Sequence, residues 1–213
     1  MNTQQKEFVR FIKLLDDNDC LQDVVVVGSW AEFLYREAGL LQGFEPNIRT
    51  LDIDFLIKNL RRPVPEKNLG KLARDAGYIV ESDFLDGTTK ILDKSGLEIE
   101  FLINKIGAGL ETTLKSNLGV TAQSLRHLNI LASNIVEVSY VGMKISVPVP
   151  EAYATHKMVI NHDRGRKQEK DTQAILNLWP FLDKEKLGAI LARLTKNEQK
   201  AARVFMETHG LEI

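Results

Sequence analysis

Acidic and apolar side chains alternate in two seven-residue segments, 51–57 and 97–103. If each segment is a β-strand, its side-chain period of two places the acidic residues on one face. The acidic residues are Asp52, Asp54, Glu98 and Glu100. The opposite faces would carry apolar residues that can pack into a core, namely Leu51, Ile53, Phe55, Leu97, Ile99 and Phe101. The acidic faces therefore need a separate explanation.

A bound cation is one explanation for the two acidic faces. If the strands pair with these faces aligned, like charges about 4 Å apart repel by roughly 4 kcal/mol at an effective dielectric constant of about 20. Two carboxylates one strand step apart can bind two divalent ions, as in-line phosphoryl transfer requires. The alternative is an ordinary solvated strand face. Leu56 and Leu102 share the acidic faces, so neither face is uniformly polar, and the repeated pattern favours a metal site.

A second candidate site follows the apolar segment 24–27, where Gly28 and Ser29 precede a helical pattern at 30–36. A turn from a buried strand into a helix presents backbone N–H groups and the positive end of the helix dipole to an anion such as phosphate. Gly28 allows close approach to the backbone, and Ser29 adds a hydroxyl donor. Serine is also a common helix N-cap, so the dipeptide alone leaves both interpretations open.

The composition is that of a globular protein without a generally basic surface. Of the 213 residues, 44% are hydrophobic, and 28 Lys and Arg nearly balance 29 Asp and Glu, so nucleic-acid contact would need a local basic patch. Cys20 is the only cysteine, which excludes an internal disulfide and indicates a reducing compartment. No apolar run is long enough to span a bilayer. We therefore expect a cytoplasmic protein with no membrane partner.

Hydrophobic periodicity predicts an α/β (α+β) fold in two parts. Helical spacing is found at 8–15, 30–36 and 67–76, and strand patterns at 24–27, 51–57, 78–80, 90–92, 97–103 and in a hairpin over 135–147. After residues 148–150 the strand signals stop, and three or four helices are predicted over 151–160, 168–179, 184–194 and 197–209. We expect a small mixed β-sheet domain, residues 1–147, followed by a C-terminal helical domain, residues 148–213, with the site between them.

A Gly-Ser turn between strand and helix, Asp-x-Asp on the next strand and a third carboxylate on a later strand resemble the DNA polymerase β-like nucleotidyltransferase superfamily. The resemblance extends over residues 24–103 through short motifs. It implies a nucleotidyltransferase domain in which Gly28 and Ser29 hold a nucleoside triphosphate. It also implies that Asp52 and Asp54 bind two Mg²⁺ (or Mn²⁺) ions.

The third carboxylate is a glutamate here, where that superfamily commonly has an aspartate. The resemblance implies that Glu100 or Glu98 completes the metal site and helps to activate an acceptor hydroxyl. We favour Glu100, because it precedes the apolar residues 101–103 and should be the more deeply buried of the two. Glu98 lies two positions after Gly96 at a turn and can be solvated.

Basic residues of the helical region and one on the second helix resemble those of AbiE-type and MenT-type toxin nucleotidyltransferases. The residues that carry this resemblance are Arg36, Lys157, Arg164, Arg166, Lys167, Lys170 and Asp171. It implies that the lysine approaches the triphosphate, that the aspartate lies near the active centre, that the acceptor is RNA such as a tRNA 3′ end, and that an antitoxin protein is a partner. Without the upstream motifs, residues 164–171 would be interpreted as a solvated loop.

Together these features predict attack by an acceptor hydroxyl on the α-phosphate of a nucleoside triphosphate, with release of pyrophosphate. Transfer to a small molecule or to a protein hydroxyl is an alternative, and so is a nucleotide-binding module without turnover. We expect Lys157 on a helix surface, where truncation to Ala would leave the fold intact. Tyr153, close to Lys157 in sequence, could stack a nucleobase.

Overall fold

The computed structural model describes residues 1–46, 51–105, 107 and 112–213. Its helices are α1 Thr3–Asp17, α2 Ser29–Glu37, α3 Leu69–Asp75, α4 Asn129–Ala132, α5 Pro150–Ile160, α6 Gln168–Leu178, α7 Lys184–Ala192 and α8 Lys196–His209. Short 3-10 turns are η1 Leu21–Asp23, η2 Asn161–Asp163, η3 Gly165–Lys167 and η4 Trp179–Phe181. Its strands are β1 Val24–Val27, β2 Asp52–Ile57, β3 Ile79–Ser82, β4 Thr89–Leu92, β5 Glu98–Asn104, β6 Thr113–Lys115, β7 Thr121–Leu125, β8 Ile135–Tyr140 and β9 Met143–Pro148.

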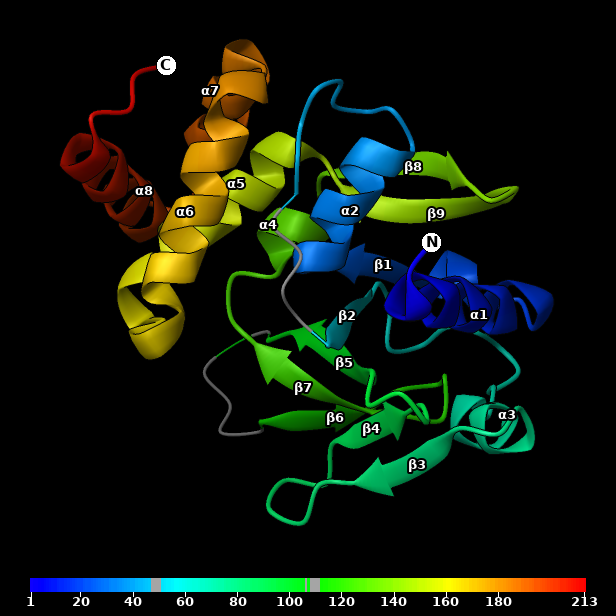
Figure 1. The fold of residues 1–213 in the computed structure, drawn as a ribbon. Helices are drawn as coiled ribbons and strands as arrows, with labels where there is room; N and C mark the ends of the chain where they lie inside the picture. Colours follow the sequence, from blue (N-terminus) through cyan, green and yellow to red (C-terminus); the bar gives the residue numbers. More distant parts are fainter. Residues whose placement is uncertain (47–50, 106, 108–111) are drawn as a thin grey trace.

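A mixed sheet organises the first part of the chain, which confirms the predicted fold class (Figure 1). Its strands follow the order β1-β2-β5-β4-β3, and β7 extends it by pairing with β5 and with β6. Strand β2 is parallel to β5, and β5 is parallel to β7, whereas the other pairs are antiparallel. Strands β8 and β9 form a separate hairpin.

The register between β2 and β5 brings the two acidic segments side by side. Asp52 is opposite Glu98, and Asp54 is opposite Glu100. Because the strands are parallel and in this register, their acidic faces coincide, which is the arrangement that the metal-site hypothesis requires. The repulsion between these carboxylates is therefore a property of the folded sheet.

The other face of these strands packs into the main core. Its buried side chains include Ile53, Phe55, Ile99 and Phe101. The prediction for Leu51 was wrong, because this residue precedes β2 and is 46% exposed. The acidic face ends in a second, small apolar cluster of Val25, Val27, Leu56, Leu102, Leu128 and Leu131. This cluster confirms that the acidic face is polar at one end only.

Helices α5 to α8 gather on one side of the molecule beside α2 (Figure 1). The main apolar cluster extends from Phe8 of α1 through the sheet to Phe205 of α8. The hydroxyl of Tyr35 on α2 donates to the carbonyl oxygen of Pro148 at 2.7 Å, so it ties α2 to the chain just before α5. The division into domains at residues 147 and 148 stays a prediction. Among the described residues, no helix is long and apolar enough to cross a membrane.

The elements that periodicity did not predict are β6, β7 and α4. Strand β7 buries Ala122 and Ser124 and exposes Gln123 between them. Its burial alternates, but its buried side chains are small or polar, so no apolar period marks it in the sequence. Strand β6 and helix α4 have only three and four residues, which is too short for a periodic signal.

Candidate active site

Gly28 closes the buried strand β1 and forms the N-cap of α2. Its φ of +66° lies in the region that favours glycine. Strand β1 is antiparallel to β2 with Val27 opposite Asp54, so the turn lies against that carboxylate. A Cβ atom at Gly28 would lie only 2.6 Å from Oδ2 of Asp54. The glycine therefore makes room for the acidic side chain as well as for the turn.

Asp54 lies in strongly negative surroundings. Burial, followed by the carboxylates of Glu100 and Asp52, raises the pKa of its carboxyl to about 6, against the lowering effect of Lys167 and Arg164. Its ionised form therefore lacks sufficient positive charge around it. Carboxylate oxygens are the ligands that Mg²⁺ prefers. The residues at this position fit a divalent cation.

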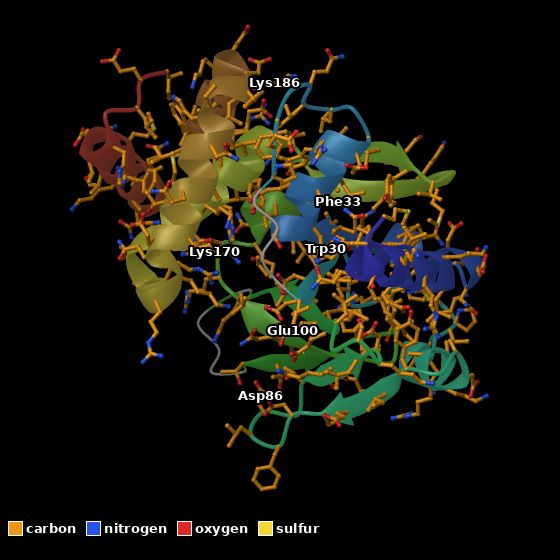
Figure 2. The ribbon with its side chains drawn as sticks, in the orientation of Figure 1. Trp30, Phe33, Asp86, Glu100, Lys170 and Lys186 are labelled. Carbon is orange, nitrogen blue, oxygen red and sulfur yellow. The ribbon has the colours of Figure 1, made fainter. Side chains whose placement is uncertain are left out.

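One cavity joins the two halves of the chain at this point. It measures about 140 Å³ and is lined by Gly28, Ser29, Glu32, Asp52, Asp54, Tyr153, Lys157, Arg164, Lys167, Lys170, Asp171 and Ala174. Glycine, serine and the aspartate pair come from the first half of the chain, whereas the four cations come from α5, α6 and the turns between them. Figure 2 shows Lys170 at the start of α6 and Glu100 on the sheet. The volume is below the ~300–1,000 Å³ typical of pockets for whole small molecules, so the cavity is of a size for phosphates and ions.

Asp171 binds two of these cations. It is only 2% exposed and accepts hydrogen bonds from Nζ of Lys157 and, at 2.7 Å, from Nε of Arg164. Burial alone would raise the pKa of Asp171, but the two cations hold it below its ordinary value. The side chain of Lys157 is only 13% exposed, so the expectation that Lys157 lies on a helix surface was wrong. Removing Lys157 would leave a buried carboxylate with one partner fewer.

Glu32 is a charged cavity residue that the sequence did not predict. It is buried on the first turns of α2 and accepts a hydrogen bond of 2.5 Å from the hydroxyl of Tyr153. The only signal for it in the sequence is an acidic residue among the apolar residues of that helix. Tyr153 is itself buried, with its ring edge-on to Tyr35 and beneath Lys157. The prediction that Tyr153 stacks a nucleobase is therefore not supported.

Four predicted residues lie outside this cavity. Arg36 is exposed and pairs with Glu45 at 2.9 Å, and Arg166 is exposed. Glu98 and Glu100 lie on β5, where both contact Nζ of Lys90. The expectation that Glu100 is the more buried was wrong, because its side chain is 34% exposed and that of Glu98 is 26% exposed.

A larger cavity, of about 660 Å³, lies between α5 and α8. Its floor includes Met158, Ala201 and Phe205, and none of the predicted site residues lines it. Within the part of the chain that the structure describes, no cluster of three or more His, Cys, Asp or Glu has the arrangement of a preformed metal site. Asp52, Asp54, Glu98 and Glu100 form an acidic row across β2 and β5. This row fits a cation because it is negatively charged and offers carboxylate oxygens as ligands.

Known structures share this fold at low sequence identity. A nucleotidyltransferase-like protein from Paracoccidioides brasiliensis is 17% identical over 92% of this chain and 85% of its own, with a TM-score of 0.55. The antibiotic-resistance factor ANT(2″)-Ia is 13% identical over 99% of this chain and 98% of its own, with a TM-score of 0.52. Its complex with adenylyl-2″-tobramycin matches at 11% identity over 98% of this chain and 99% of its own, with a TM-score of 0.51.

A comparison with sequence families identifies the chain more directly. No curated protein matches the sequence. A family model described as nucleotidyltransferase matches residues 6–199, which include the Gly28 turn, both acidic strands and the cations of α5 and α6. Because this match extends over most of the chain, the protein belongs to that nucleotidyltransferase family.

Proposed function

We propose that the protein transfers a nucleoside monophosphate from a nucleoside triphosphate to an acceptor hydroxyl. The observation that carries this proposal is that one cavity joins the Asp52 and Asp54 carboxylates, the Gly28 turn and four cations. Carboxylates beside cations suit a substrate that brings both phosphates and divalent ions. Family membership supports nucleotidyl transfer in general.

The acidic row would hold Mg²⁺ or Mn²⁺ through Asp52, Asp54 and one glutamate of β5. When bound, these ions neutralise charge on the reacting phosphate and stabilise the attacking and leaving oxygens. Backbone N–H groups at Gly28 and Ser29 would bind a phosphate at the N-terminus of α2. The four cations that line the cavity would bind the remaining phosphate oxygens, and they are Lys157, Arg164, Lys167 and Lys170.

The chemical step exchanges a phosphoanhydride bond for a phosphate ester bond. The acceptor oxygen forms a bond to the α-phosphorus while the bond to the β-phosphate oxygen breaks, so pyrophosphate leaves. The hydroxyl proton passes to a carboxylate oxygen, which we assign to Glu100. Glu100 is opposite Asp54 in the sheet, and Asp54 lies against the phosphate-binding turn.

RNA, such as a tRNA 3′ end, is the acceptor that we propose first. Arg166 is exposed and lies between Arg164 and Lys167, which both line the cavity, so a backbone phosphate can be bound beside the site. The resemblance to AbiE-type and MenT-type toxins supports the same acceptor and an antitoxin partner. A small hydroxyl compound is the second candidate, because ANT(2″)-Ia, which shares the fold, has been determined with adenylyl-2″-tobramycin.

Label transfer distinguishes these acceptors. Each of the four nucleoside triphosphates, labelled at the α-phosphate, is incubated with the protein, Mg²⁺ or Mn²⁺, and a pool of total RNA, protein or small metabolites. We expect label in RNA with the parent and none with Asp54→Asn. Label in the small-molecule pool or in the protein pool would show that the acceptor belongs to that class and is not RNA. Triphosphate binding without label in any pool would identify a nucleotide-binding module without turnover.

A further inference from the structure

Lys90 supplies positive charge to the acidic face from the strand next to β5. It lies on β4 opposite Glu100. Its Nζ atom is 2.6 Å from Oε1 of Glu98 and 3.2 Å from Oε1 of Glu100. Its side chain is partly buried, so this ion pair is less screened than one on the open surface. A single lysine therefore binds both glutamates of β5.

The sheet places four carboxylates on two adjoining strands, and Lys90 is the cation that pairs with two of them. Asp52 and Asp54 stand opposite Glu98 and Glu100 across parallel strands, and like charges in such positions destabilise a sheet. The cations that line the cavity with the aspartate pair come from α5, α6 and the turns between them. Lys90 thus compensates the glutamate side of the row, where those cations make no contact among the described residues.

We infer that Lys90 is a positioning residue that holds Glu98 more closely than Glu100, so that Glu100 is the glutamate that acts with the aspartate pair. The shorter of its two contacts is to Glu98. Glu100 has the longer contact and stands opposite Asp54, the aspartate that touches the phosphate-binding turn. This inference rests on the proposed function. It assigns Glu100 as the third carboxylate from the lengths of the two contacts with Lys90, because the burial of the two glutamates does not favour Glu100.

Removing the lysine has two consequences that a purely structural role would not produce. The acidic row becomes more negative, so a divalent ion binds more tightly in the absence of nucleotide. At the same time both glutamates are released, so Glu98 competes with Glu100 and transfer becomes slower. A tighter metal site with slower turnover is therefore the signature of positioning by Lys90.

The test compares the full-length parent with Lys90→Met, Lys90→Arg and the matched control Lys71→Met. Lys71 pairs with a single carboxylate, Asp75, on α3 at 3.9 Å. Thermal unfolding is followed against Mn²⁺ concentration without nucleotide, and kcat and KM are measured for label transfer. We expect half of the Mn²⁺-dependent stabilisation of Lys90→Met to be reached at a roughly threefold lower Mn²⁺ concentration than in the parent. We also expect its kcat to be about tenfold lower and its KM to be little changed. Lys90→Arg should restore both values, and Lys71→Met should match the parent.

Each result has a defined meaning. If the parent responds to Mn²⁺ and Lys90→Met gives the same midpoint and kcat, the role assigned to Lys90 is wrong while the proposed function stands. If the parent itself shows neither a metal response nor transfer, the proposed function fails and this inference fails with it. Should Lys90→Met not fold, Glu100→Gln and Glu98→Gln decide, because Glu100→Gln must reduce kcat far more, and the reverse order would overturn the assignment.

Discussion

Asp54 combines the features expected of a ligand-binding acid, and none of them stabilises the protein without a ligand. It is partly buried, it faces the carboxylates of Asp52 and Glu100, and it limits the space at Gly28. Repulsion among these groups costs free energy in the folded state. A bound cation would recover that free energy, so the folded protein should be stabilised by metal and triphosphate.

We predict that Asp54→Asn abolishes this stabilisation. At a ligand concentration of 100 times Kd, a ligand that binds only the folded state adds about 2.7 kcal/mol to the free energy of unfolding. Calorimetry with and without Mg²⁺ and triphosphate should show this increase in the parent only. The ligand-free variant should be no less stable than the parent, because a repelled charge has been removed. Asp75→Asn, on the exposed side of α3, is the control, and an equal response in Asp54→Asn would exclude Asp54 from a metal site.

Lys170 is a cleaner probe of phosphate binding than Lys157. Lys157 is bound to the buried Asp171, so its truncation would also cost about 3–5 kcal/mol of stability. Lys170 is exposed at the start of α6 and lines the same cavity (Figure 2). Truncation of an exposed lysine removes little packing.

Lys170→Ala should therefore weaken triphosphate binding and leave stability within about 0.5 kcal/mol of the parent. The loss of one charge-assisted hydrogen bond, about 1.5–3 kcal/mol, corresponds to a tenfold to hundredfold increase in Kd. Isothermal titration calorimetry measures this change. Lys186→Ala, an exposed lysine on α7 (Figure 2), should bind like the parent. Unchanged affinity in Lys170→Ala would place Lys170 outside the phosphate site.

At the scale of elements, the β1–α2 turn and β2 form one structural unit. The turn requires a positive φ at Gly28, and the neighbouring strand delivers Asp54 into the space that a Cβ atom would need. Gly39, after the same helix, also has a positive φ, but a Cβ atom there would meet nothing within 4 Å. Substitution of Gly39 therefore tests backbone strain alone, whereas substitution of Gly28 tests backbone strain together with contact with Asp54.

Both Gly28→Ala and Gly39→Ala should destabilise the protein, because a backbone conformation with positive φ costs a non-glycine residue about 1–3 kcal/mol. Gly28→Ala should cost more, since its methyl group displaces Asp54, and it should also lose the response to metal and triphosphate. Gly39→Ala should keep that response in full. Urea unfolding with and without ligand checks both. The idea that Gly28 and Asp54 share one site fails if Gly28→Ala keeps the full response.

For the whole molecule, we expect stability to depend on pH through a histidine of α5. His156 lies on α5 beside Lys157. Burial, together with the charges of Lys157 and Arg164, lowers the pKa of His156 to about 3 from an ordinary value of 6.5. The unfolded chain therefore binds a proton between these pH values that the folded protein does not bind. Stability from this group is complete above pH 6.5 and is lost as the pH falls toward 3.

We predict that the free energy of unfolding falls between pH 6.5 and pH 5 by a term of the order of 1–2 kcal/mol from His156. Urea unfolding at the two pH values measures the fall. His156→Gln should reduce it, whereas His162→Gln, at an exposed position, should not. An equal fall in His156→Gln would mean that another group controls the acid response.

Much of the fold was predictable because its elements carry strong local patterns. The acidic strands share one pattern, so pairing them in register aligns both their acidic and their apolar faces, and the structure has that register. Strand β1, helix α2 and helices α5 to α8 likewise follow apolar runs or periods in the sequence. Strands β6 and β7 escaped prediction because they are short and bury small or polar side chains.

By itself, the sequence determined which residue types stand on which face of each element, and hence the acidic row and the Gly28 turn. Only the tertiary structure decided which charges meet, because ion pairs form between residues far apart in the chain. Asp171 binds Lys157 and Arg164, and Glu32 accepts a hydrogen bond from Tyr153. Lys90 forms ion pairs with both Glu98 and Glu100. The relative burial of the two glutamates was decided in the same way, since neighbouring strands and side chains set how much solvent reaches each carboxylate.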